Sequence, residues 1–415
     1  MNSLKILSAL ALIALYCLLF FILFTNLNLV VDFTSFYSAL ANLAQGKSPY
    51  DSLFSVFFPI NKPLSANLNP PFVFFLFKPF ALMPYPKALF CWTLLSFFAG
   101  LSGAMLAFYH AFSRVFFSRH WLILMGVYLS LFSTLMNFSI GQAGLLLLFL
   151  IMLGYHFYLG EHNVLAGILW GLAAALKFFP ALLFVFAIKQ KRPTLALFMV
   201  LTLLLAFGIP LLCYGTAIYG QYLAMMAKVF WYGDNWNGSL YGFLFRFIAN
   251  RALVDSLYLI LLGLMLCWYL KKMRLFNADY PHQPFCLTLV MMLLMSPLGW
   301  LYYFPLLLFP LAIAFSSKAL SLRTALCTLL CLFLLNLPQG YLPAPKMPHS
   351  TFALLLASCY FYGLLLLAYL TSSKEPVSIQ YKTADLYWPV FAILSFGLLM
   401  TLCQFVWQMN ALTAS

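Results

Sequence analysis

The sequence predicts an all-α protein that crosses a membrane many times, and three observations lead to this fold class. Hydrophobic residues make up 65% of the 415 residues, charged residues only 7%, and the mean hydropathy is +0.98. Soluble domains carry about 25% charged residues. Long apolar segments also recur from one end of the chain to the other. Lipid admits only helices or closed barrels, and these segments are too continuous for barrel strands.

The net charge of +14 indicates membrane topology, because basic residues collect in the cytoplasmic loops of membrane proteins. The chain has no Lys/Arg-rich tail, zinc-finger spacing or glycine-rich phosphate loop, so nucleic acid is not an expected partner. The nine cysteines lie within or at the ends of apolar segments, where packing is their usual role. We therefore expect neither a metal site nor a cofactor.

The first helix follows Lys5, which places the N-terminus in the cytoplasm. Its apolar segment is longer than the ~7–15 residues of a signal-peptide core, so we expect it to remain uncleaved. Basic turns at 114–119, 189–192 and 271–274 are then placed inside, whereas the Pro/Gly turns between helices are placed outside. After the first helix, the expected helices lie in order at about 86–110, 121–138, 143–159, 164–177, 179–190 and 194–213. One more ends at the basic turn 271–274, and the rest lie at about 284–297 and 301–316, twice between 320 and 372, and at 386–408.

This arrangement gives about 12–13 membrane-spanning helices in a single membrane domain, residues 1–415. The inner connections are short, whereas two long loops lie outside, at 26–85 with juxtamembrane helices and at 214–253. Loops far above the usual ~4–6 residues tend to carry function. We therefore expect chemistry on the extracytoplasmic face.

Asp32 stands about one turn beyond the expected end of the first helix. A charge at the bilayer centre costs about 2.5–3.5 kcal/mol, and less near the interface. An acid here can end the first helix or cap the next one, which is a structural role. Alternatively, a partly desolvated carboxylate at the outer surface can act as a general base for a hydroxyl acceptor. Composition alone does not decide between these two roles.

Five motifs follow Asp32 in order, and together they resemble glycosyltransferase family 87. They are GKSPYD with NPPFVFFLFKPFALMP (46–84), Gly-Gln before a leucine run (141–142), AGILWGLAAALKFFP (166–180), NGSLYGFLFR (237–246) and SPLGW (296–300). The resemblance covers about residues 25–310, whereas the helices in 320–415 match only in hydrophobicity and are treated as variable. It implies a GT-C fold and a polyprenyl-phosphate-sugar donor, typically mannose.

The resemblance implies that Asp32 is the general base. Asp51 lies in a Ser-Pro-Tyr-Asp turn and is expected to be a turn residue. Lys177 lies between two short helices at an outward apex, where a lysine can simply extend to the interface. Its place after an alanine-rich helix and before a proline matches the family, so we also expect it to neutralise the leaving phosphate.

Four further residues are expected to bind the donor phosphate or sugar. Arg246 presents a planar fork suited to phosphate oxygens, although an interfacial anchor is the alternative role. Asn237 and Ser239 precede it in the same motif and are expected to orient the sugar or the phosphate. Gln142 at an outer tip can hydrogen-bond substrate, although capping a helix is the favoured role.

One departure from the family concerns Tyr302 and Tyr303. Many members carry a histidine pair after the SP-x-x-W turn, whereas this chain has two tyrosines there. Tyrosine can donate a hydrogen bond to phosphate but supplies no imidazolium charge. Either Lys177 and Arg246 hold the phosphate alone, or the donor or acceptor differs.

The sequence therefore predicts a glycosyltransferase in the inner membrane. It would move a sugar, mannose by resemblance, from a polyprenyl-phosphate donor to a lipid or glycan hydroxyl with inversion. A transporter or flippase of lipid-linked glycans is the alternative, but it should place charges along several helix interiors, which are nearly absent here. A non-catalytic membrane protein that keeps the fold is the third hypothesis, and it leaves Asp32 and Lys177 unexplained.

Overall fold

The computed structural model describes residues 3–25, 31–51, 53, 64, 67–229, 231–274, 281–316, 321–343, 350–372 and 386–413. The described residues are mainly helical and contain no β-strand, only an isolated bridge between Asn237 and Trp300. The predicted all-α class is therefore confirmed.

The chain divides into two compact units. Unit 1 comprises Met1–Leu19, Ala107–Leu135 and Trp231–Ser415, and unit 2 comprises Phe20–Leu106 and Met136–Phe230. The grouping of all residues into one membrane domain stays a prediction.

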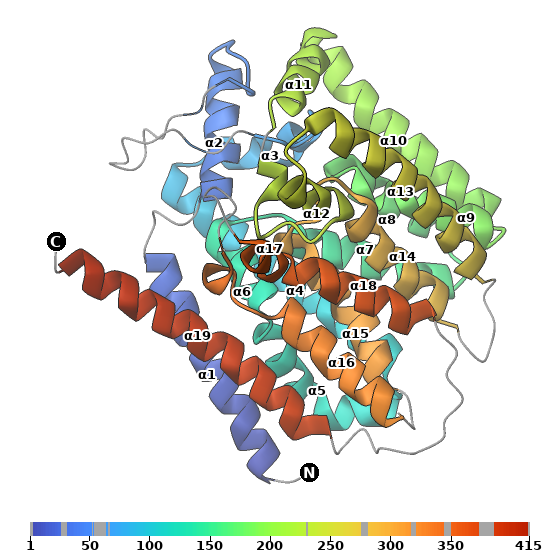
Figure 1. The fold of residues 1–415 in the computed structure, drawn as a ribbon. Helices are drawn as coiled ribbons and strands as arrows, with labels where there is room; N and C mark the ends of the chain where they lie inside the picture. The colour runs from blue at the N-terminus through green and yellow to red at the C-terminus, as the bar shows by residue number, and fades with distance from the viewer. Residues whose placement is uncertain are drawn as a thin grey trace. The chain divides into compact units, whose positions relative to one another are not determined.

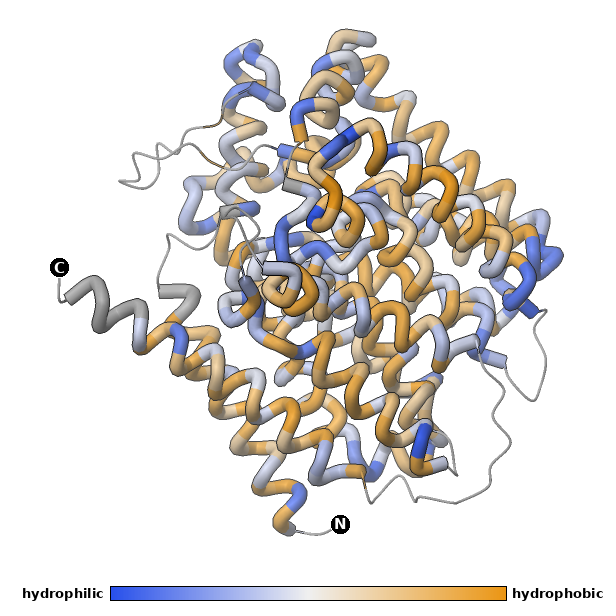
Figure 2. The backbone as a smooth tube through the Cα atoms, viewed as in Figure 1, coloured by the Kyte–Doolittle hydropathy of each residue, from blue (hydrophilic) through white to orange (hydrophobic). Residues whose placement is uncertain are grey.

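Membrane-spanning length is reached by five helices among the described residues. These spans are Ser3–Ile22, Tyr85–Ala111, Pro193–Tyr214, Arg251–Lys272 and Tyr387–Trp407. A sixth is counted if the bent pair Arg114–Leu129 and Phe132–Ile140 is one span. Seven further apolar helices are shorter, and Figure 2 shows hydrophobic residues along most helices, with hydrophilic residues gathered at several helix ends and connections. The protein is thus a multi-pass membrane protein, whereas 12–13 crossings stays a prediction.

Unit 2 is built around α8 (Asn163–Leu176), which packs against α7 (Gly144–Leu159) and α10 (Pro193–Tyr214). Two glycines of α8 bring its backbone close to α10: a Cβ at Gly167 would lie 2.6 Å from the Leu195 carbonyl oxygen, and one at Gly171 would lie 2.6 Å from the Thr202 side chain. Small residues permit such close helix approach in membranes. The other elements of this unit are α2 (Val31–Ala44), α3 (Val73–Ala81), most of α4 (Tyr85–Ala111), part of α6 (Phe132–Ile140), η2 (Phe179–Ala181), α9 (Leu182–Lys189) and α11 (Ala217–Ala227).

Unit 1 is centred on α14 (Gln283–Met295) and α16 (Leu322–Leu335), both packed on α18 (Cys359–Ser372), as Figure 1 shows. Residues Pro284 to Leu294 of α14 are all buried, so this helix forms the core of the unit. The other elements are most of α1 (Ser3–Thr25), α5 (Arg114–Leu129), η3 (Trp231–Gly233), α12 (Leu240–Phe247), α13 (Arg251–Lys272), η4 (Leu301–Leu307), α15 (Leu308–Ser316), η5 (Gln339–Tyr341), α17 (Thr351–Leu356) and α19 (Tyr387–Thr413).

The continuous helix predicted over 121–138 is wrong. The chain bends by 60° between α5 and α6. At the break the Ser130 hydroxyl donates to the Gly126 carbonyl (2.6 Å), and the Asn336 side chain accepts from the amide of Phe132 (2.7 Å). The bend is stable because Asn336, from a distant helix, satisfies an amide that the interrupted ladder leaves open.

Candidate active site

Asp32 lies in the first turn of α2, which is anchored by the residue next to it. Phe33 is fully buried, with its ring stacked on Trp92 at a centroid distance of 6.1 Å and edge-on to Phe80 at 6.2 Å. Thr34 adds a 2.7 Å hydrogen bond between its hydroxyl and that of Tyr85. These contacts fix the start of the helix, while Asp32 itself remains partly exposed. A carboxylate in a first helical turn is favoured by the helix dipole.

Gln142 holds the Asp32 carboxylate. Its Nε2 donates to Asp32 Oδ2 at 2.7 Å, and its Oε1 accepts from the amide of Ala143 at 3.0 Å. The second bond assigns the orientation of the amide, so that its NH2 group points to the carboxylate. Gln142 is only 3% exposed, and it leads into α7 at the point where helix capping was expected. Both ends of the amide therefore have partners within the chain. The contact of Gln142 with substrate stays a prediction.

Trp92 positions the turn that carries Gln142. Gly141 adopts φ of 71°, a left-handed conformation that glycine enters without steric cost. Its carbonyl accepts a 2.9 Å hydrogen bond from Trp92 Nε1. The same indole ring is stacked on Phe33, so one side chain braces both the Asp32 helix and the Gln142 turn.

Lys177 follows α8 directly, with extended backbone angles (φ −147°, ψ 136°) that end the helix before Pro180. The predicted break between two short helices is confirmed. The charge of Lys177 interacts with Asp32. Burial raises the pKa of Asp32 to about 6, although Lys177 and the Gln142 hydrogen bond both favour the ionised form. Burial likewise lowers the pKa of Lys177 to about 8, and Asp32 opposes that change.

A second group of candidate residues lies in unit 1, where two sequence motifs pair with each other. Asn237 and Trp300 form the isolated antiparallel bridge. Asn237 Nδ2 donates to the carbonyls of Tyr232 and Pro297, both at 2.9 Å, and Ser239 Oγ donates to Pro297 at 3.2 Å. Ser239 also caps α12 by accepting from the amide of Gly242 at 3.0 Å. Both side chains are fully buried and organise the loop, so a contact with the sugar stays a prediction.

Arg246 is buried beneath this loop and holds it through backbone carbonyls. Its Nη1 donates to the carbonyls of Asp234 (3.0 Å) and Asn237 (3.1 Å), and its Nε donates to the Ser358 hydroxyl (2.9 Å). Its Nη2 has no hydrogen-bond partner among the described residues. Burial lowers the pKa of Arg246 to about 10, so the guanidinium stays charged near neutral pH. This nitrogen is itself buried, and binding of the donor phosphate by Arg246 stays a prediction.

The two tyrosines at the family's histidine positions have different surroundings. Tyr303 is 2% exposed, and its ring is stacked on Trp300 with a centroid distance of 6.5 Å. Tyr302 is partly exposed, with its ring edge-on to Trp300 at 6.2 Å. The buried Nε1 of Trp300 has no partner among the residues described. Binding of the donor by either tyrosine stays a prediction.

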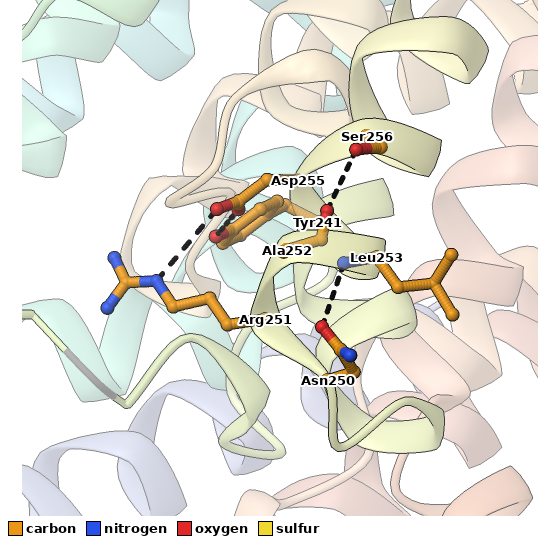
Figure 3. Close-up of polar contacts among 7 residues, drawn as sticks. All are labelled: Tyr241, Asn250, Arg251, Ala252, Leu253, Asp255 and Ser256. Carbon is orange, nitrogen blue, oxygen red and sulfur yellow. Dashed lines mark hydrogen bonds and ion pairs between the residues drawn. The ribbon is translucent and has the colours of Figure 1, made fainter.

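Figure 3 shows a contact that joins α12 to α13. The Tyr241 hydroxyl donates to Asp255 Oδ1 at 2.6 Å, and Arg251 Nε lies 4.0 Å from Asp255 Oδ2. Asn250 caps α13 by accepting from the amide of Leu253 at 3.1 Å. The contact fixes the start of α13 against the helix that carries Arg246.

The sequence profile of glycosyltransferase family 87 matches residues 67–297, more than half of the chain. The chain belongs to glycosyltransferase family 87. It is therefore a membrane glycosyltransferase that takes a sugar donor and an acceptor, as predicted. No curated protein and no solved structure matches the chain. Among the described residues, no three His, Cys, Asp or Glu side chains gather as a metal site.

Within this family 87 enzyme the structure brings Asp32, Gln142 and Lys177 together in unit 2, and Asn237, Ser239, Arg246, Tyr302 and Tyr303 belong to unit 1. Sequence reasoning missed the bracing role of Trp92 and the contact of Ser358 with Arg246. Trp92 and its partner Gly141 are 49 residues apart, so no local pattern joined them. Ser358 lies in the C-terminal part that matched only in hydrophobicity, so no motif signalled it.

Proposed function

We propose that this enzyme moves mannose from a polyprenyl-phosphate donor to a hydroxyl group of a lipid or glycan acceptor, with inversion of the anomeric centre. The reaction would take place on the extracytoplasmic face of the inner membrane, with the N-terminus in the cytoplasm and a GT-C arrangement of helices. One observation carries the proposal: a partly exposed carboxylate, Asp32, is held by the buried amide of Gln142 and interacts with the charge of Lys177.

Asp32 would act as the general base. With a pKa of about 6 it is about nine-tenths ionised at pH 7, yet more basic than an ordinary aspartate. It takes the proton of the acceptor hydroxyl as the acceptor oxygen forms its bond to the anomeric carbon. The bond from that carbon to the phosphate oxygen breaks on the opposite face, and its electron pair leaves with the polyprenyl phosphate.

Lys177 would stabilise the departing phosphate. A pKa of about 8 leaves it largely protonated at pH 7, and a positioned cation acts most strongly where charge develops in a water-poor site. Arg246 is the second candidate, through the positive charge of its guanidinium. Tyr302 and Tyr303 would contribute neutral hydrogen bonds in place of the family's imidazole groups.

The test is transfer of radiolabelled mannose from polyprenyl phosphate to candidate acceptors by the purified enzyme. Asp32→Asn keeps the shape of the side chain and removes the base, so we expect the transfer rate to fall by roughly 10²–10⁴-fold. Asp51→Asn is the matched control, because Asp51 is an exposed outer-loop acid that follows a turn, and its rate should not change. Unchanged transfer in Asp32→Asn would remove the proposed base.

A further inference from the structure

An apolar cavity of about 180 Å³ lies in unit 1, where the end of α4 meets α1, α5, α15, α16 and α19. Its walls include Phe112, Leu124, Leu311 and Leu332. An apolar cavity of roughly 150 Å³ is enough to bind benzene, so this one holds a short stretch of hydrocarbon chain. None of the residues assigned to catalysis or donor binding lines it.

Among the described lining residues, Lys5, His120 and Tyr387 supply the polar side-chain atoms. The Lys5 ammonium lies 4.9 Å above the centre of the Tyr387 ring, and the Tyr387 hydroxyl donates to the Lys5 carbonyl at 2.9 Å. The same hydroxyl is 2.6 Å from Ser8 Oγ, which fixes the first turn of α1 on the start of α19. His120 stacks on Phe116 at 4.3 Å, with its Nδ1 2.9 Å from the Phe116 carbonyl oxygen. A positioned cation and an imidazole therefore border an otherwise apolar cavity.

Among the residues that the structure describes, the charged side chains at and beside this cavity are basic. Arg114 and Arg119 are exposed on the first turns of α5, the helix that also supplies His120. The acidic side chains described in unit 1 are Asp234 and Asp255, and neither lines the cavity. Basic pockets between membrane helices recognise anionic lipid head groups. α1 and α19 are both membrane-length helices with mostly unburied spans, so a lipid chain can approach from the bilayer.

We propose that this cavity binds one anionic phospholipid, with an acyl chain between the helices that line it and the phosphate at Lys5 and His120. The site is separate from the proposed catalytic group and does not depend on it. Its ligand carries both features that the cavity requires, a hydrocarbon chain and a negative head group. A zwitterionic lipid satisfies the first feature without supplying net charge for the second.

The experiment measures lipid binding to the full-length enzyme, purified and delipidated in a non-ionic detergent, by native mass spectrometry with apparent melting temperature as a second readout. Phosphatidylglycerol is compared with phosphatidylcholine of the same acyl chains and with inorganic phosphate. We expect phosphatidylglycerol to bind and to raise the melting temperature, and the other two to have little effect. Lys5→Gln should weaken phosphatidylglycerol binding about fivefold, the amount expected for one basic residue at a membrane surface.

Two variants complete the design. Val127→Phe narrows the cavity from a partly exposed wall position and should abolish phosphatidylglycerol binding while Lys5 is intact. Lys271→Gln removes an exposed basic residue at the end of α13 and should leave binding unchanged. Equal binding of the two lipids, competition by inorganic phosphate, or an equal loss in Lys271→Gln would overturn the proposal. A melting temperature that falls in Lys5→Gln by the same amount with and without lipid would assign Lys5 to a contact within the chain.

Discussion

Replacing Gln142 by leucine tests whether its amide tunes the proposed base. The substitution removes the 2.7 Å hydrogen bond that stabilises the ionised form of Asp32. A hydrogen bond to a charged group is worth about 1.5–3 kcal/mol, and one pKa unit corresponds to about 1.36 kcal/mol. The pKa of Asp32 should therefore rise from about 6 to roughly 7–8.

The consequence is a displaced pH profile. In the unmodified enzyme, activity should rise with pH through about 6 as Asp32 ionises and fall above about 8 as Lys177 loses its proton. In Gln142→Leu the ionised fraction of Asp32 at pH 7 falls from about nine-tenths to between about one-half and one-tenth. The rate at pH 7 should fall about two- to tenfold, with partial recovery at higher pH.

The measurement is kcat/KM for mannosyl transfer between pH 5 and pH 9. Gln221→Leu is the control, because Gln221 is an exposed glutamine of the same unit that accepts from the Ser48 hydroxyl (2.9 Å) and does not contact Asp32. An acidic limb that stays at the same pH in Gln142→Leu would refute the reasoning, as would an equal shift in Gln221→Leu.

Three further substitutions each test one contact within a unit. Trp92→Phe keeps an aromatic ring against Phe33 but loses the indole N–H and its hydrogen bond to Gly141, worth about 1 kcal/mol. The kcat should fall about fivefold with the donor KM unchanged. A loss of thermal stability with no kinetic change would contradict the bracing role. Gly299→Ala places a Cβ against a backbone carbonyl and should lower the free energy of unfolding by at least about 2 kcal/mol, measured by thermal unfolding. Gly263→Ala is the control, because a Cβ there enters open space on α13 and should be neutral or stabilising. Tyr241→Phe loses the hydrogen bond to Asp255 and should lower the free energy of unfolding by about 1 kcal/mol or less. Thermal unfolding of the variant with and without Asp255→Asn measures the coupling between the two side chains.

The sequence was sufficient to predict the helical class and local breaks, because these follow from hydropathy and from residues adjacent in the chain. Lys177 and its break are one example, because Pro180 follows three residues later and a proline one to three residues beyond a helix is a local stop signal. The helix at 121–138 was wrongly predicted because its break is stabilised by Asn336, 204 residues away. Gln142 and Asp32 are likewise 110 residues apart, and no local pattern predicts which carboxylate a buried amide will meet.

Two motifs that contact each other show the same limit of prediction from sequence. NGSLYGFLFR and SPLGW were recognised separately as family features, and a donor-binding role was expected for residues of the first. The structure shows that the Asn237 and Ser239 side chains of the first motif donate to the Pro297 carbonyl of the second. Asn237 and Ser239 therefore have a packing role that the sequence alone did not indicate. The catalytic hypothesis consequently depends more on Asp32 and Lys177 than on these residues.

Asp32 itself offers a final test, because a structural cap and a catalytic base differ in their effect on stability. An ionised cap stabilises the folded state. Burial has raised the pKa of Asp32 from 3.8 to about 6, so the ionised carboxylate destabilises the folded state instead. At about 1.36 kcal/mol per unit this corresponds to a cost of up to about 3 kcal/mol above pH 6, declining as pH falls from 6 to 4 and absent below that. Asp32→Asn should therefore raise the apparent melting temperature at pH 7.5 while lowering the transfer rate by roughly 10²–10⁴-fold, and the gain in stability should disappear near pH 4. A residue that destabilises the fold is expected where function requires it, so a higher melting temperature in the variant supports the catalytic base. A melting temperature that falls at pH 7.5 would instead support the structural cap.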